Sequence, residues 1–124
     1  MKKILIVEDN PSQLYAYKNK LQGNGLEILT ASTGVEALSL LKKEKPDLML
    51  LDIMLPGPLS GFDVLSRLRS DPETKNIETL VVTNLDDAQK TAKELGAFDY
   101  IVKSDATLES VIKKIREKLG YKKT

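Results

Sequence analysis

Five polar side chains in this sequence directly follow short apolar runs, and their types suit one kind of chemistry. They are Glu8 and Asp9 after residues 4–7, Asp52 after 48–51, Thr83 after 80–82, and Lys103 after 100–102. If the three carboxylates converge, they repel one another unless a cation lies among them, and oxygen-only ligands favour Mg²⁺. A magnesium site beside a lysine suits phosphoryl transfer, because both cations neutralise the charge of the transferring group. An aspartate can itself accept the phosphoryl group.

The apolar runs have the pattern of buried parallel strands. Residues 4–7 and 48–51 are apolar throughout, as expected for strands covered on both faces. A helical pattern follows each run, which indicates an α/β domain of three layers. The expected strands are 4–7, 27–31, 48–51, 80–82 and 100–102, and the expected helices are 11–22, 33–45, 62–71, 86–95 and 108–119. Ligands bind beyond the carboxyl ends of such strands, so the five polar side chains should converge at one edge of the sheet.

Several residues should define where helices begin and end. Thr33 and Glu36 have the spacing of a capping box at the start of the second helix. Asp86 or Asp87 can cap the fourth helix, and Gly96 should stop it.

The composition excludes several classes of protein. The 124 residues suit a single domain over 1–124, with residues 120–124 expected to fray and no room for an appended catalytic or DNA-binding domain. Cysteine and histidine are absent, which excludes disulfides, Ser-His-Asp catalysis and nearly all zinc chemistry. The 19 basic and 18 acidic residues leave a net charge of +1, which gives no case for nucleic-acid or membrane binding. Without a long apolar run or signal peptide, we expect a cytoplasmic protein.

At these residues the sequence resembles the response-regulator receiver domain of two-component signalling. The matching segments are IVEDN at 6–10, LLDIMLPG at 50–57, VT at 82–83 and GAFDYIVK at 96–103. Four segments in this order and at these separations are highly specific. The resemblance implies a doubly wound, flavodoxin-like fold with five helices and five parallel strands in the order 2-1-3-4-5.

The resemblance also implies a role for each site residue. Asp52 would be the phosphoacceptor, and Mg²⁺ would be held by Glu8, Asp9, Asp52 and the backbone carbonyl of Met54. Lys103 would bind the phosphoryl group, Thr83 would be the switch hydroxyl, and Tyr100 would be the switch aromatic. For Tyr100 a second interpretation stays open, that of a half-buried strand tyrosine with no switching role.

Four positions depart from the family pattern. Glu8 replaces the usual aspartate, and Gly61 lies nine positions after Asp52, one more than usual, because the loop 56–61 is longer. Asn84 stands where a small residue is usual, so it could narrow access to the phosphoryl group. Ser104 replaces the usual proline, so no cis-proline follows Lys103, and either Ser104 or Asp105 could cap the last helix.

The expected function is a stand-alone phospho-switch. A sensor histidine kinase or phosphotransfer protein would donate the phosphoryl group, because the chain has no histidine of its own. A downstream protein would then bind in trans to a surface of the fourth helix, fifth strand and fifth helix. The chain would be a monomer, or a dimer formed on phosphorylation, and would catalyse only its own phosphorylation and dephosphorylation.

Two alternatives to this function remain. An aspartyl-phosphate phosphatase would share the site, but such enzymes commonly carry an acidic proton donor where this chain has Met54. An interaction module working unphosphorylated would keep the fold without the chemistry. The last segment, 104–124, holds six basic and three acidic residues, which we read as helix-end and solvated charges rather than a nucleic-acid site.

Overall fold

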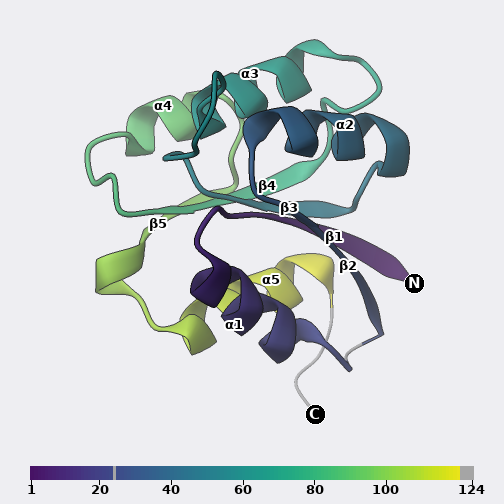
Figure 1. The fold of residues 1–124 in the computed structure, drawn as a ribbon, viewed down its shortest axis with the longest axis vertical. Coiled ribbons are helices and arrows are strands. Elements are labelled where there is room, and N and C mark those ends of the chain that lie inside the picture. The colour runs from purple at the N-terminus through teal and green to yellow at the C-terminus, as the bar shows by residue number, and fades with distance from the viewer. Residues whose placement is uncertain (24, 121–124) are drawn as a thin grey trace.

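The computed structural model describes residues 1–23 and 25–120. Its centre is a sheet of five parallel strands in the order β2-β1-β3-β4-β5 (Figure 1). The strands are β1 (Lys2–Val7), β2 (Leu26–Ala31), β3 (Leu48–Leu51), β4 (Glu78–Thr83) and β5 (Asp99–Val102). The predicted sheet and strand order are therefore confirmed, and β1 and β4 each begin two residues earlier than the apolar runs suggest.

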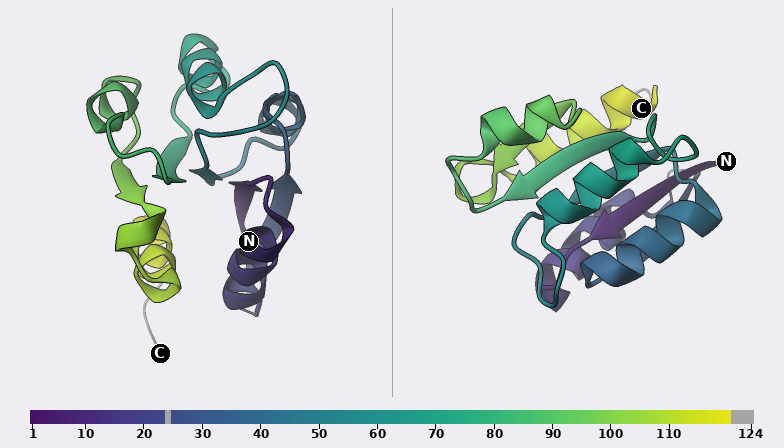
Figure 2. Two further views of the ribbon diagram at one scale, coloured as in Figure 1. Left: turned by 60° about the vertical axis from the view of Figure 1, so that its left-hand side comes forward. Right: turned by 90° about the horizontal axis from the view of Figure 1, so that it is seen from above.

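Five α-helices and one 3-10 turn complete the fold, and the helices form a layer on each face of the sheet (Figures 1 and 2). They are α1 (Pro11–Leu21), α2 (Gly34–Glu44), α3 (Gly61–Ser70), α4 (Gln89–Glu94), the 3-10 turn η1 (Lys103–Asp105) and α5 (Leu108–Leu119). Helices α1 and α5 cover one face, and α2, α3 and α4 cover the other. The three-layer α/β architecture predicted from the alternating pattern is confirmed.

Side chains of each strand alternate between two apolar cores, one on each face of the sheet. Ile4 and Ile6 of β1 pack with α1 and α5, whereas Leu5 and Val7 pack with α2, α3 and α4. All four are at most 1% exposed. Because both faces are covered, the strands contain apolar residues at consecutive positions rather than at alternating ones.

The helix caps differ from prediction at two places. Thr33 caps α2 as predicted, and its hydroxyl accepts from Glu36 N at 3.2 Å, but the Glu36 carboxylate accepts from Ser32 N rather than closing the box. The predicted cap at Asp86 or Asp87 is wrong, because the backbone does not become helical until after Ala88, which has no side-chain oxygen.

The last helix has the predicted bounds, 108–119, but its N-cap differs from prediction. The predicted cap at Ser104 or Asp105 is wrong, because both residues belong to η1 and Thr107 is the N-cap, accepting from Ser110 N at 3.1 Å. Of the predicted tail over 120–124, Gly120 is the C-cap of α5, and residues 121–124 lie outside the described residues. Across the described ranges, every helix is too short or too polar to cross a membrane.

Arg69 at the end of α3 joins three segments of the chain through its guanidinium group. Its five N–H donors are all used: they reach the carbonyl oxygens of residues 75, 77, 95 and 96 and the hydroxyl of Thr79, at 2.7–3.4 Å. The guanidinium therefore holds the C-terminal end of α4 against α3 and the start of β4. A Cβ at Gly96 would lie 2.5 Å from Arg69 Nε, so this close approach requires glycine.

A second close approach lies at Gly61, the first residue of α3. A Cβ built there would lie 2.3 Å from Asp52 O and 2.5 Å from Ile53 Cα. The backbone N–H of Gly61 also donates to Ile53 O at 2.8 Å. The start of α3 is thus packed directly on the chain that leaves β3, although the loop between them is one residue longer than the family pattern.

We expect Gly61→Ala to lower the free energy of unfolding by about 2–3 kcal/mol, because the added methyl group must displace backbone atoms rather than a flexible side chain. Chemical denaturation followed by circular dichroism measures this. Gly57→Ala is the control. A Cβ added at Gly57 would have no atom within 4 Å, so only the strain of its φ of +89° should lower the free energy of unfolding, by about 1 kcal/mol. Equal losses in the two variants would contradict the contact.

Candidate functional site

The predicted site residues converge where the strands end. Val7 pairs with Leu51 across β1 and β3, so Glu8 and Asp52 leave the sheet at the same level. Backbone hydrogen bonds continue the sheet one residue further, with Glu8 N donating to Ala31 O at 3.0 Å and Asp52 N donating to Val7 O at 3.1 Å. Both side chains are buried, at 2% and 6% exposed.

Glu8, Asp9 and Asp52 form an acidic cluster. One carboxylate oxygen from each lies within 4.8 Å of the others, and Asp9 is the exposed member. Such a set of oxygen donors fits a hard divalent cation such as Mg²⁺, and no histidine or cysteine is present to favour a softer metal. The convergence predicted from the strand ends is therefore present in the structure for these three carboxylates.

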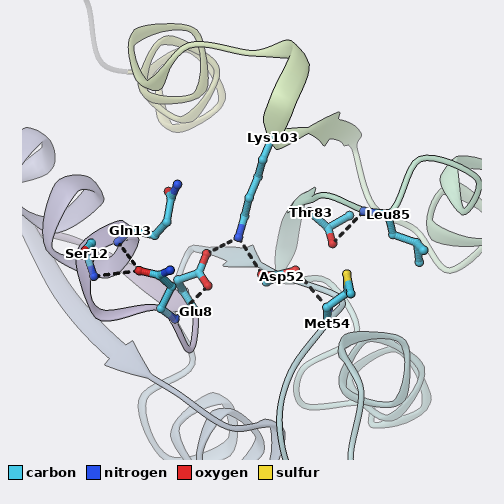
Figure 3. Close-up of polar contacts among 9 residues, drawn as sticks. Glu8, Ser12, Gln13, Asp52, Met54, Thr83, Leu85 and Lys103 are labelled. Atoms are coloured by element: carbon cyan, nitrogen blue, oxygen red, sulfur yellow. Dashed lines mark hydrogen bonds and ion pairs between the residues drawn. The ribbon is translucent and has the colours of Figure 1, made fainter.

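Lys103 bridges two of these carboxylates (Figure 3). Its Nζ lies 2.6 Å from Glu8 Oε1 and 2.8 Å from Asp52 Oδ2, and its side chain is 13% exposed. A single ammonium group therefore neutralises part of the charge of two buried carboxylates that come from different strands. Figure 3 shows Lys103 reaching down to both from the end of β5.

Burial and charge act in opposite directions on this bridge. Burial raises the pKa of Glu8 above its usual range, and the hydrogen bond from Lys103 only partly reverses that rise. Burial lowers the pKa of Lys103, but hydrogen bonds to Asp52 and Glu8 outweigh this effect, so its pKa is raised. Lys103 thus stays cationic at neutral pH.

The second oxygen of each bridged carboxylate accepts a backbone N–H. Asn10 N donates to Glu8 Oε2 at 3.2 Å, and Met54 N donates to Asp52 Oδ1 at 3.0 Å (Figure 3). Each carboxylate is therefore held at both oxygens, once by Lys103 and once by the loop that follows it. These two bonds could not be found from residue types, because any residue except proline can supply the N–H. The Met54 side chain is exposed, and its carbonyl as a metal ligand stays a prediction.

Thr83 and Tyr100 both contact the backbone of one residue, Leu85. The Thr83 hydroxyl, fully buried, accepts from Leu85 N at 3.4 Å, and the Tyr100 hydroxyl donates to Leu85 O. Tyr100 is 8% exposed, so its ring lies inside the molecule. The two residues suggested as switch groups are thus connected through a loop residue that the sequence did not indicate. Asn84, between Thr83 and Leu85, is exposed.

The model of the response regulator receiver domain matches residues 4–116 of this chain. The chain belongs to this family. Protein PilH of Pseudomonas aeruginosa is 39% identical over 107 residues, which cover 83% of this chain and 86% of PilH. The regulatory protein PhoP of Bacillus subtilis, named for alkaline phosphatase synthesis, is 39% identical over 102 residues, but the match covers only 42% of it. Apart from PilH, the relatives that we compared are matched over about half of their length or less.

Solved structures of receiver domains have the same fold. A CheY-like receiver domain protein from Methanospirillum hungatei superposes with a TM-score of 0.86 at 30% identity, covering 97% of this chain and 94% of that one. The phosphorylated cyanobacterial phytochrome response regulator RcpA gives a TM-score of 0.83 at 33% identity, with 94% and 91% covered. The resemblance read from the four motifs is confirmed: this is a receiver domain of two-component signalling.

We expect Lys103→Met to lower the free energy of unfolding of this receiver domain at pH 7 by about 3 kcal/mol, because two buried carboxylates lose their counter-charge. The pKa of Glu8 should then rise further in the folded state while its unfolded value is unchanged. Protonation therefore favours folding of the variant, and the deficit should shrink as the pH falls through the folded-state pKa of Glu8.

Urea denaturation in EDTA at neutral and mildly acidic pH measures this. Lys113→Met, on the exposed side of α5, is the matched control and should change stability little at either pH. A deficit that is absent, or that grows as the pH falls, would contradict the bridge.

Proposed function

We propose that this receiver domain is a stand-alone phospho-switch that accepts a phosphoryl group on Asp52. The main support is one contact: Asp52, buried in an acidic cluster, accepts a hydrogen bond from Lys103 Nζ at 2.8 Å. A carboxylate nucleophile, a fixed ammonium group and two further carboxylates are the parts that aspartyl phosphorylation requires. The similarity to PilH, of which the chain covers most, supports action as a single domain over 1–124.

In the proposed step, a carboxylate oxygen of Asp52 attacks the phosphorus of a phosphohistidine on a sensor kinase or phosphotransfer protein. An O–P bond forms, the P–N bond breaks, and its electron pair leaves with the imidazole nitrogen. Lys103, whose Nζ lies 2.8 Å from Asp52 Oδ2, would stabilise the negative charge on the phosphoryl oxygens. The receiver domain would itself catalyse both this gain and the later hydrolytic loss of the phosphoryl group.

The acidic cluster would hold Mg²⁺ through Glu8, Asp9, Asp52 and the Met54 carbonyl. When bound, the ion supplies positive charge to the transferring group. Glu8 replaces the more usual aspartate, and its longer side chain reaches Lys103 at 2.6 Å while remaining within the cluster. The Glu8 carboxylate could therefore interact with either Lys103 or the metal ion.

The signal would pass through Leu85 to the surface formed by α4, β5 and α5. A phosphoryl group adds about −1.5 to −2 charge and attracts donors such as the Thr83 hydroxyl. If Thr83 turns toward it, Leu85 N loses its acceptor, and the loop that also binds the Tyr100 hydroxyl is repositioned. A downstream protein would read the change in trans, either on a monomer or on a dimer formed by phosphorylation. A cytoplasmic location for this relay stays a prediction.

Asp52 should be the residue that is modified. Incubation with acetyl phosphate and Mg²⁺ should add one phosphoryl mass to the intact protein, and Asp52→Asn should abolish the addition. EDTA should abolish it as well, because the acidic cluster then lacks the cation that neutralises the incoming phosphate. Intact-protein mass spectrometry measures all three results.

Asp105→Asn, an exposed aspartate in η1, is the matched control and should be labelled like the wild type. Persistent labelling of Asp52→Asn would sink the assignment, and no labelling of the wild type would favour an interaction module working unphosphorylated. Turnover of p-nitrophenyl phosphate well above that of Asp52→Asn would instead favour a phosphatase.

Asn84 should control how long the phosphoryl group lasts. It is exposed beside Thr83, and its amide is larger than the small residue usual there. Asn84→Ala should speed hydrolysis about threefold by opening access for water, which corresponds to ~0.7 kcal/mol of barrier. The decay of the phosphorylated mass after removal of acetyl phosphate gives the rate, with Gln89→Ala, at the exposed start of α4, as control. An unchanged or slower decay would refute the role.

A further inference from the structure

A cavity of about 290 Å³ lies between α1 and α5, directly beside the phosphorylation site. Val82 and Val111 supply apolar wall, and Gln13 and Thr107 add polar groups. Lys103 also lines it, so the cavity and the acidic cluster share this lysine. Figure 3 shows Gln13 of α1 on this side of Lys103, away from Thr83. No part of the proposed phosphoryl transfer uses the cavity.

Tyr17 of α1 also lines this cavity, and its hydroxyl group has no hydrogen-bond partner among the described residues, 1–23 and 25–120. Its side chain is 3% exposed and belongs to the core between α1, α5 and the sheet. The hydroxyl oxygen is not itself fully buried, so water in the cavity can reach it and act as its hydrogen-bond partner.

Lys103 has an unused donor at the same cavity. An ammonium group carries three N–H donors, and two of them reach Glu8 and Asp52. None of the described residues accepts from the third. Burial raises the pKa of Tyr17, and the charges of Lys103, Glu8 and Asp52 also act on it, so the hydroxyl stays protonated near the lysine.

We propose that ordered water in this cavity connects the Tyr17 hydroxyl to the third N–H of Lys103, which makes Tyr17 a positioning residue for Lys103. A water molecule needs two to four polar partners and about 30 Å³, and the cavity provides both. The inference rests on the proposed function, because it assigns a part in phosphoryl transfer to a residue outside the acidic cluster.

A water-mediated contact between Tyr17 and Lys103 would hold the lysine in place during phosphoryl transfer. Both carboxylates that hold Lys103 are groups that a metal ion and a phosphoryl group would recruit. Once they are recruited, Lys103 keeps its place only if something else holds it. Water bound to Tyr17 is such a support, and it does not compete with the metal because the phenol is uncharged.

Tyr17→Phe tests the proposal, because it keeps the ring in the core and removes only the hydroxyl. Phosphorylation of Asp52 by acetyl phosphate at saturating Mg²⁺ should slow about fivefold, as for the loss of one ordinary hydrogen bond. Tyr15→Phe is the matched control: Tyr15 lies on the same helix, is 70% exposed and should be unaffected.

A double-mutant cycle separates positioning from a general effect on the fold. In a Lys103→Ala background, Tyr17→Phe should cause no further slowing, because the lysine that it positions is gone. Slowing that persists in that background would overturn the proposal, as would equal rates for Tyr17→Phe and Tyr15→Phe.

The water itself is tested without any reaction. A high-resolution crystal structure of the wild-type protein should show water within hydrogen-bond distance of both Tyr17 Oη and Lys103 Nζ, and Tyr17→Phe should lose it. A dry cavity would overturn the proposal even if Asp52 is phosphorylated. Failure of the wild type to be phosphorylated, with this water present, would count against the proposed function and leave Tyr17 and Lys103 connected.

Discussion

Two buried carboxylates and one lysine impose a constraint on which the rest of the structure depends. Lys103 lies 95 residues after Glu8 and 51 residues after Asp52 in the chain. Its Nζ nevertheless lies within 2.8 Å of a carboxylate oxygen of each. The three side chains meet because β1, β3 and β5 run in parallel and end at the same edge of the sheet. Removing two carboxylates from water costs free energy that a single ammonium group only partly returns. The site is therefore a cost to stability, offset by the two apolar cores on either side of the sheet.

Much of the fold could be predicted from the sequence because strands covered on both faces contain runs of consecutive apolar residues. The polar residue that ends each run, such as Asp52, then marks the edge where ligands bind. Capping was harder to predict, since a cap depends on where the backbone first becomes helical. Asp86 is a good capping residue, but α4 begins only after Ala88. Contacts that use backbone atoms, such as those of Leu85 or the carbonyl oxygens that accept from Arg69, leave almost no signal in residue types.

The site is held by groups of very different kinds. Lys103 supplies charge from β5, whereas Asn10 and Met54 supply only backbone N–H groups to the same carboxylates. The backbone donors move only with their loops, and the loop after Asp52 is tied to α3 through Gly61. Each carboxylate thus has one oxygen held independently of the lysine, which would suit the proposed gain and loss of a phosphoryl group at Asp52.

Arg69 has a consequence for how α4 can move. It binds the carbonyl oxygens of residues 95 and 96 at the C-terminal end of this short helix, while the loop that contains Leu85 leads from the site to its N-terminal end. Because Arg69 fixes the C-terminal end of α4, a shift of the loop that contains Leu85 would displace the start of this helix more than its end. The helix would then turn about the guanidinium group of Arg69 rather than slide along the sheet.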